Sequence, residues 1–268
     1  MNWLSMSRER SQPSDHPASR RTAKPGKRRL DLLVVERGLA SSRERAQALL
    51  LRGQVRVNGT TAMKAGAQVP ADAHIDLIGA PLRYASRGGL KLEGALEDFG
   101  VCAEGKVCLD VGSSNGGFTD CFLQHQARKV YAVDVTIDQL DWKLRQDTRV
   151  VPVERNARYL QAQDIGEPVE LVSVDVSFIS VRMILPALLP LAAPGADFLI
   201  LVKPQFELEK REVGKGGIVR ETELQQKAIE RVKESASETG LFILDLRESR
   251  ITGAGGNQEF FLHAKRRE

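Results

Sequence analysis

The stretch Lys106-Val-Cys-Leu-Asp-Val-Gly-Ser-Ser-Asn-Gly-Gly-Phe-Thr-Asp120 decides the fold of this chain. It begins with Val107 to Val111, a short apolar run that is typical of a buried parallel strand. The loop Gly112–Gly117 follows with three glycines, the residue used where the backbone turns sharply or closely approaches a ligand. Phe118 to Gln126 then predicts a helix. Strand, glycine loop and helix together form the nucleotide-binding corner of a doubly wound α/β fold.

The spacing of the loop glycines restricts the ligand. The pattern G-x-x-x-G-G is neither the dinucleotide fingerprint nor the P-loop, and no lysine follows it, so a phosphate ligand is not expected. Val130 to Val133 predicts a second strand that ends at Asp134, 22 residues past Gly112. An acid about 20 residues past the first glycine suits the hydroxyls of a ribose. The spacing therefore favours a nucleoside ligand over the alternative, a structural turn with a helix-capping aspartate.

The rest of the chain predicts a mostly parallel sheet of seven strands. Five further apolar runs alternate with helical stretches such as Thr222–Glu238, and ligands of such folds lie at the carboxyl edge of the strands. Asp134, Asp175 and Lys203 each follow a predicted strand, so we expect them in one crevice. The five runs are Val150–Val153, Leu171–Val174, Asp197–Val202, Leu241–Leu246 and Glu259–His263.

The composition is that of a soluble globular protein. With 42% hydrophobic and 28% charged residues, the 268-residue chain suffices for one α/β domain and a small module. Cys102, Cys108 and Cys121 form no C-x-x-C pair, and we expect buried thiols in a reducing cytosol, with no disulfide and no metal site. The longest apolar stretch, Met183–Val202, contains three prolines and Asp197, so we expect a helix, a turn and a strand, not a membrane span.

The charge is distributed unevenly along the chain. Residues 1–29 carry a net +6, residues 30–88 carry +3, and residues 89–268 carry −5. A basic front end on a mildly acidic body indicates that the front end meets a polyanion.

The front part predicts a tail and a small α+β module. Residues 1–28 are rich in serine, arginine and proline, which predicts a disordered basic tail, and we assign no function to it. Residues 29–78 predict two helices, a strand before the hairpin turn Asn58-Gly59, and further strand at Val69–Ile78. A linker, residues 79–89, then leads into the second domain, residues 90–268.

Four arginines lie around the second helix and the first strand of the front module. A merely solvated helix face is the alternative to a binding surface. The order of elements resembles the S-four-type RNA-binding module, in which the basic helix and the following loop bind the backbone of structured RNA. The resemblance rests on Arg29-Leu-Asp31, Ser42–Ala46, Arg52-Gly53 and Val57-Asn-Gly59, and the four arginines are Arg43, Arg45, Arg52 and Arg56.

Seven stretches of the chain carry a wider resemblance: Ser86–Lys91, Leu109–Asp120, Asp138–Leu144, Asp175–Ile179, Lys203–Phe206, Gly214–Arg220 and Gly255–Phe260. With them, residues 29–268 resemble the TlyA family, S-adenosylmethionine-dependent rRNA 2′-O-methyltransferases long labelled hemolysins. Its catalytic domain is similar to the FtsJ-like methyltransferases. The resemblance implies a class I, Rossmann-like methyltransferase fold, S-adenosylmethionine as the cofactor, and ribosomal RNA in ribosomal subunits as the partner, with methylation of cytidine in the cytoplasm.

The resemblance also implies the site residues, and no metal. The catalytic residues are the tetrad Lys91, Asp175, Lys203 and Glu259. Arg87 joins the four arginines of the front module as an RNA contact. Three departures from the family pattern bear on cofactor affinity rather than on reaction type: Asn115, Thr136-Ile137 and a residue missing near Glu154–Asn156. The cofactor-binding residues are Gly112, Ser113, Ser114, Asn115, Gly116, Gly117, Asp134, Asn156 and Asp175.

The chemistry of ribose methylation gives each member of the tetrad a role. A ribose hydroxyl is a weak nucleophile, so the protein has to orient it in line with the methyl donor and take up its proton. We assign Lys203 as the group nearest the hydroxyl, where it orients the oxygen and stabilises charge, while Asp175 and Glu259 hold the lysines. Two alternatives stay open: a catalytically silent RNA-binding or ribosome-assembly protein, and a membrane-active hemolysin.

Overall fold

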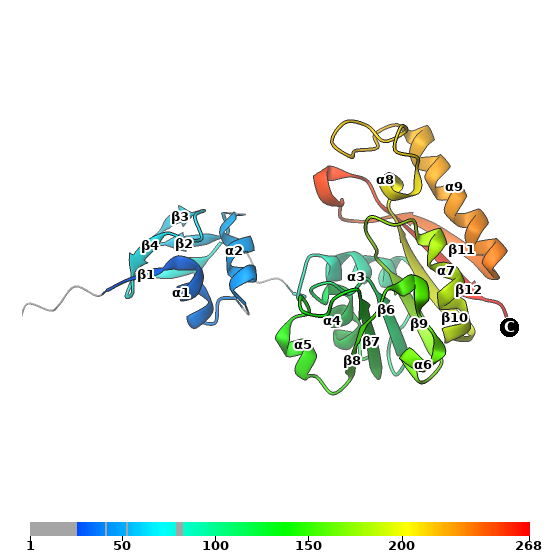
Figure 1. Ribbon diagram of the computed structural model, residues 1–268, viewed down its shortest axis with the longest axis horizontal. Coiled ribbons are helices and arrows are strands. Elements are labelled where there is room, and N and C mark those ends of the chain that lie inside the picture. Colours follow the sequence, from blue (N-terminus) through cyan, green and yellow to red (C-terminus); the bar gives the residue numbers. More distant parts are fainter. Residues whose placement is uncertain (1–25, 41, 52, 79–82) are drawn as a thin grey trace, which may run out of the picture. The chain divides into compact units, whose positions relative to one another are not determined.

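The computed structural model describes residues 26–40, 42–51, 53–78 and 83–268. The chain divides after Gly79 into two compact units. In the second unit the described residues form a seven-stranded sheet with the order β11-β12-β10-β9-β6-β7-β8 (Figure 1). The strands are β6 (Val107–Val111), β7 (Lys129–Asp134), β8 (Val150–Glu154), β9 (Val169–Val174), β10 (Ala192–Val202), β11 (Leu241–Glu248) and β12 (Phe260–Arg266).

The five strands from β10 to β8 run parallel, and β12 runs antiparallel to both β10 and β11. The prediction of a mostly parallel sheet is therefore confirmed. All five residues of β6 are buried, because its two neighbours cover both edges and helices cover both faces.

Successive residues of a strand point to opposite faces, so the sheet has a core on each side. Cys108 packs with α3 (Gly88–Phe99) and α4 (Gly117–Gln124), whereas Leu109 packs on the other side with α7 (Leu185–Leu188) and α9 (Thr222–Thr239). Figure 1 shows α9 alongside β11. The remaining helices are short: α5 (Trp142–Gln146), α6 (Ala162–Ile165), α8 (Pro204–Glu207) and the 3₁₀ turns η1 (Ala157–Tyr159), η2 (Val181–Met183), η3 (Leu189–Leu191) and η4 (Ala254–Gly256).

The first unit packs two helices on short strands. Its core is formed by apolar residues of both helices and of the central strand, such as Leu30, Leu50 and Val55. Asn58 and Gly59 have φ of 50° and 81°, as the predicted hairpin turn requires. The elements are β1 (Lys27–Arg29), α1 (Leu30–Glu36), α2 (Arg43–Leu51), β2 (Val55–Val57), β3 (Thr60–Ala62), β4 (Gln68–Pro70) and β5 (Ile75–Leu77).

Several details differ from the sequence-based expectations. Val69–Ile78 is not one strand: β4 pairs with β1, whereas β5 pairs with β2 in a separate sheet. Lys27 and Arg28, expected in the disordered tail, pair with β4, while residues 1–25 lie outside the described part of the chain. Cys102 is exposed, so the expectation of three buried thiols is wrong for it.

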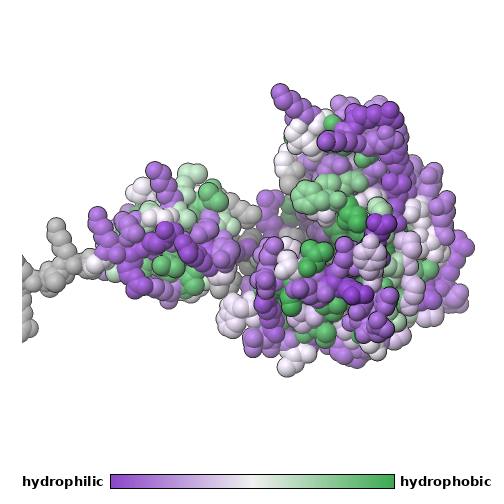
Figure 2. Space-filling model, viewed as in Figure 1, coloured by the Kyte–Doolittle hydropathy of each residue, from purple (hydrophilic) through white to green (hydrophobic). Residues whose placement is uncertain are grey.

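Within the described ranges, no helix combines the length and the apolar character that crossing a membrane requires. On the face drawn in Figure 2 the surface of each unit is mostly hydrophilic, and hydrophobic side chains gather only in small groups.

Candidate active site

The register of the sheet brings the predicted polar residues to one edge. Val174 pairs with Ile200 of β10, and Val202 pairs with Phe260 of β12. Asp175 and Lys203 come directly after these parallel strands. Glu259 comes directly before the antiparallel β12, so it lies at the same edge.

Two buried ion pairs lie at this edge. Lys91 Nζ is 2.5 Å from Glu259 Oε2, and only 12% and 2% of the two side chains are exposed. Lys203 Nζ is 2.5 Å from Asp175 Oδ1, with 10% and 19% exposed, and it also donates to Ser177 Oγ at 3.0 Å. The four residues of the predicted tetrad thus form two pairs. Burying a charge is costly unless it is paired, so each charge is held by its partner.

Glycines in the stretch before Lys91 bring its helix close to the glycine loop. A Cβ on Gly89 would overlap with the Tyr84 ring, and a Cβ on Gly117 would overlap with Ser86 Oγ. The backbone N–H of Ala85 donates to Asp120 Oδ2 of α4 at 2.8 Å. The glycines before Lys91 therefore pack against protein.

Glu259 is held in a similar way. A Cβ on Gly253 would overlap with its carboxylate, so this position needs glycine. The Ser249 N–H donates to the backbone oxygen of Glu259 at 2.8 Å. Gly253 therefore leaves room for the carboxylate that receives Lys91, and Ser249 holds the backbone of Glu259.

The glycine loop is shaped by its protein neighbours as well. Gly112 and Gly116 have φ of +88° and +86°, a region that favours glycine. A Cβ on Gly112 would overlap with the backbone oxygen of Asp175, and one on Gly116 would overlap with Leu144. The loop can therefore lie close to the carboxyl end of β9.

Asp134 supports the loop from the end of β7. Its Oδ2 accepts from the Ser114 N–H at 2.8 Å, and its Oδ1 accepts from the Val135 N–H at 2.7 Å. Each carboxylate oxygen can accept a further hydrogen bond, so the carboxylate can also meet a ligand in the neighbouring pocket.

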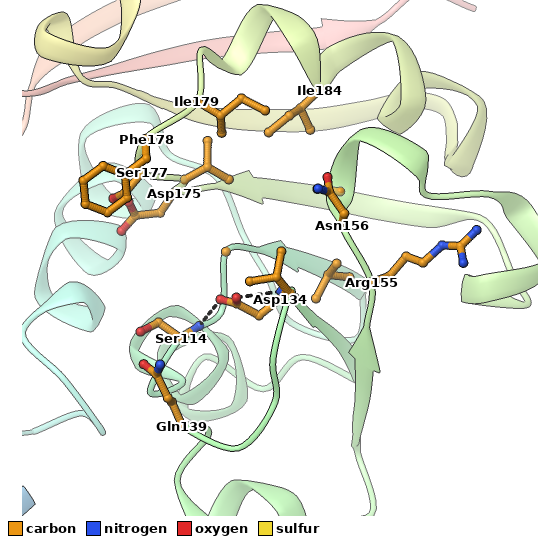
Figure 3. Close-up of a pocket in the computed structure, with 15 residues that line it drawn as sticks. Ser114, Asp134, Gln139, Arg155, Asn156, Asp175, Ser177, Phe178, Ile179 and Ile184 are labelled. Carbon is orange, nitrogen blue, oxygen red and sulfur yellow. Dashed lines mark hydrogen bonds between the residues drawn. The ribbon is translucent and has the colours of Figure 1, made fainter. Parts of the chain in front are cut away.

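A pocket of about 510 Å³ opens between these segments (Figure 3). Figure 3 shows Asp175, Ser177 and Phe178 on one side of it, with Ser114 and Asp134 on another. Of the nine predicted cofactor-binding residues, five line the pocket: Gly112, Ser114, Asp134, Asn156 and Asp175.

The other four predicted residues do not line the pocket. Asn115 Nδ2 donates to the backbone oxygen of Gln139 at 3.0 Å, so it braces the loop after β7. Gly116 and Gly117 are buried against their protein neighbours. Ser113 Oγ is buried and finds no hydrogen-bond partner among the described residues, which leaves one polar atom of the loop unsatisfied.

Sequence reasoning did not single out Ser177 and Phe178. Phe178 is 92% exposed and has a φ of 66°, rare for a non-glycine residue. Its ring lies 5.3 Å from the Phe206 ring. The position of Ser177 and Phe178 just after β9 was the signal that could have identified them, since residues that follow parallel strands reach the carboxyl edge of the sheet.

Part of the pocket lining is apolar. The sequence did not predict the residues there, which follow neighbouring strands or precede α7. They are Val135, Ala157, Ile179 and Ile184.

Asp110 lies buried in β6, one residue from the loop. It accepts from Thr119 Oγ1 at 2.6 Å and from Ser173 Oγ at 3.3 Å. The pKa of Asp110 is raised to about 7, chiefly because desolvation disfavours the charged form and also through the charge of Asp175, against the lowering effect of the hydrogen bonds from Thr119 and Ser173.

The arginines of the first unit differ in what they contact. Arg43 Nε donates to Oδ2 of the buried Asp31 at 2.9 Å, and Arg29 binds the same carboxylate. The Arg29 guanidinium holds the pKa of Asp31 well below its usual range. Arg45 also has an interaction partner, Arg56 is exposed on β2, and Arg52 lies outside the described residues. Arg43 is thus partly engaged within the unit.

Arg87, the fifth predicted RNA contact, belongs to the second unit. It is exposed and precedes α3, four residues before Lys91. It therefore lies on the same segment as the first tetrad lysine.

Comparison with known proteins assigns both units. The family model of the FtsJ-like methyltransferase matches residues 84–266, and that of the S4 domain matches residues 28–75. The putative rRNA methyltransferase YqxC of Bacillus subtilis is 49% identical over 88% of this chain and 85% of its own length. The 16S/23S rRNA (cytidine-2′-O)-methyltransferase TlyA of Mycobacterium tuberculosis is 43% identical over 87% of this chain and 88% of its own.

A solved structure is similar over the same extent. A putative hemolysin from Streptococcus thermophilus matches with a TM-score of 0.72 and 42% identity, covering 91% of this chain and 90% of that one. With a family model across the second unit and relatives of high identity along nearly the whole length, the chain belongs to the TlyA family of FtsJ-like methyltransferases.

Proposed function

We propose that this protein transfers a methyl group from S-adenosylmethionine to the 2′-hydroxyl of a cytidine in ribosomal RNA. The observation that carries the proposal is Lys203, a buried lysine paired with Asp175, which lines a pocket whose other side presents Asp134. The names of the two rRNA methyltransferase relatives support the choice of substrate.

The pocket residues fit the proposed cofactor. Asp134 can accept hydrogen bonds from both ribose hydroxyls, as an acid at the end of the second strand does in nucleoside sites. Val135, Ile179 and Ile184 offer apolar surface for a base, and Asn156 can hydrogen-bond its edge. When bound, S-adenosylmethionine supplies an electrophilic methyl group.

Lys203 is placed to act on the acceptor oxygen. An ammonium has three N–H donors; Lys203 gives one to Ser177 Oγ, and Asp175 is its ion-pair partner. A further N–H can bind the 2′-hydroxyl of the target nucleotide. We therefore assign Lys203 to orient this oxygen and to stabilise the negative charge that develops on it as its proton passes to solvent water. Lys91, paired with Glu259, adds a second positive charge at the same sheet edge.

An exposed aromatic ring at the pocket suits a nucleobase. Base–aromatic stacking needs a free ring face, and Phe178 is 92% exposed beside the pocket. Its backbone conformation is unfavourable for phenylalanine, which supports a functional reason for its presence. The S4 domain and its arginines then supply affinity for the RNA backbone.

The test is methyl transfer to ribosomal RNA with radiolabelled S-adenosylmethionine, followed by mapping of 2′-O-methyl sites. Wild-type protein should label RNA at a cytidine ribose, whereas Lys203→Ala should lose single-turnover rate while binding the cofactor nearly as well. Lys265→Ala, on the far half of β12, is the matched control and should behave as wild type. A wild-type protein that binds RNA but transfers no methyl would favour the catalytically silent alternative.

A further inference from the structure

The structure contains a buried carboxylate that neither ion pair of the active site uses. Glu207 ends α8, four residues after Lys203, and is only 2% exposed. Its Oε2 accepts from Ser180 Oγ at 2.5 Å, and its Oε1 accepts from the Val181 N–H at 2.8 Å. Arg182 Nε lies 3.3 Å from Oε2 and is the positive charge that faces it. A carboxylate this deeply buried is costly unless such donors hold it.

The donors to Glu207 belong to one short segment between β9 and α7, residues 177–182, which we call the rim segment. The rim segment contacts α8 and Lys203, the residue that precedes α8, at three points. Ser177 Oγ accepts from Lys203, the Phe178 ring packs on the Phe206 ring, and Ser180 with Val181 binds Glu207. Glu207 is thus the charged anchor of a contact whose other end is the proposed catalytic lysine.

The rim segment needs such an anchor. Ser177 and Phe178 are exposed, so packing alone does not fix them. Phe178 has a φ of 66°, which a non-glycine residue keeps only where surrounding contacts hold it. Two hydrogen bonds to a buried carboxylate, one of them from a backbone N–H, restrain the segment two and three residues after Phe178.

We propose that Glu207 is a positioning residue for methyl transfer. It fixes the rim segment against α8, and thereby sets Ser177 against the Lys203 ammonium and holds Phe178 at the pocket. This inference rests on the proposed function for its kinetic consequence. The positioning itself is a property of the chain that can be measured without activity.

The experiment compares Glu207→Ala with Glu207→Gln and with a matched control, Glu212→Ala. Glu212 accepts hydrogen bonds from Lys227, from Arg231 and from the Glu209 N–H, and none of these donors belongs to the rim segment. Arg231 also donates to the backbone oxygen of Glu207, which every variant retains. Glutamine in place of Glu207 can still accept from the Val181 N–H and can donate to Ser180 Oγ. Each full-length variant is measured for amide hydrogen exchange, cofactor affinity and single-turnover methyl transfer.

We expect Glu207→Ala to speed exchange of the amides at 177–183 by about tenfold or more, because the anchored N–H of Val181 loses its acceptor. Transfer should slow by about tenfold or more, since misplacing reacting groups lowers the rate. Cofactor affinity should change less than the rate, because Gly112, Asp134 and Asn156 form the other walls. Glu207→Gln should retain most of the rate, and Glu212→Ala should retain both the rate and the exchange pattern at 177–183.

Wild-type exchange at 177–183 in folded Glu207→Ala would overturn the proposal, and so would an equal rate loss in Glu212→Ala. If Glu207→Ala does not fold, Ser180→Ala serves instead: it removes the Ser180 donor to Glu207 together with the acceptor of the Arg182 N–H. Wild-type exchange and rate in that variant would overturn the proposal. If the wild-type protein transfers no methyl, the proposed function fails, while hydrogen exchange still decides whether Glu207 anchors the segment.

Discussion

Lys91 and Glu259 are 168 positions apart in the chain, yet the Lys91 ammonium lies 2.5 Å from the Glu259 carboxylate. The pair joins α3, which precedes β6, to Glu259, the residue that precedes β12. It leaves Lys203 to pair with Asp175. The two lysines thus have separate carboxylate partners at one edge of the sheet.

The Lys91–Glu259 pair should be costly to break from one side. Lys91→Met or Glu259→Gln leaves one buried charge without its partner, which should destabilise the fold by about 3–5 kcal/mol. The double variant should recover much of this stability, because no charge is left unpaired, but should not recover methyl transfer. Urea unfolding and single-turnover assays measure the two effects. A double variant with the wild-type transfer rate would show that the pair is structural only.

Asp134 should control cofactor affinity. Asp134→Ala removes the proposed acceptor of the ribose hydroxyls and should weaken S-adenosylmethionine binding by about 1–3 kcal/mol, measured by calorimetry. Part of the loss comes from the Ser114 N–H, which loses its acceptor. Asp138→Ala is the control, since 90% of the Asp138 side chain is exposed nearby. Equal affinity of wild type and Asp134→Ala would contradict the assignment.

Asp110 should make stability depend on pH. Its folded-state pKa of about 7 lies above its ordinary value of 3.8, so the folded chain keeps the proton that the unfolded chain releases. Stability is therefore lost as pH rises from about 4 to about 7, by up to about 4 kcal/mol. Asp110→Asn removes this loss, so its stability relative to wild type should rise between pH 5 and pH 8. Thermal unfolding of both proteins at pH 5 and pH 8 measures this difference in stability. A stability difference between Asp110→Asn and wild type that is the same at both pH values would contradict the prediction.

Phe178 should serve the RNA rather than the fold. Phe178→Ala should lower transfer to RNA through loss of stacking worth about 1–3 kcal/mol, while Phe178→Tyr keeps the ring and most of the rate. The melting temperature should not fall, because the ring is exposed and its backbone is strained. Phe242→Ala, at another exposed phenylalanine, is the control. A rate loss matched by a large loss of stability would instead indicate a structural role.

The arginines of the S4 domain should contribute to RNA affinity through charge. Replacing Arg43 and Arg56 with alanine should weaken binding for all RNA sequences and reduce the salt dependence by about one slope unit per lost phosphate contact. Arg43 should contribute less than Arg56, because Asp31 already holds it. Titrations at several salt concentrations measure both slopes, with cofactor affinity as the control. An unchanged slope in the double variant would remove these arginines from the RNA interface.

The sequence by itself determined the features that depend on neighbouring residues. The apolar run Val107–Val111 predicted the strand that the structure shows there. Asn58-Gly59 predicted the hairpin turn that joins β2 to β3. The alternation of runs and helices predicted the mostly parallel sheet, since parallel strands need connections of roughly a dozen or more residues, usually a helix. Asp175 and Lys203 were predicted to share one edge because each follows a parallel strand.

Only the tertiary structure decided which groups meet. Spacing does not tell which carboxylate pairs with which lysine, since the partners come from distant segments. Nor does it tell that Gly89 packs against Tyr84 or that Asp31 holds Arg43. The proton on Asp110 depends on complete removal from water, and the anchoring of residues 177–182 depends on Glu207 from another element. Burial and pairing arise when segments that are distant in the sequence pack together, and local sequence patterns do not encode which segments will meet.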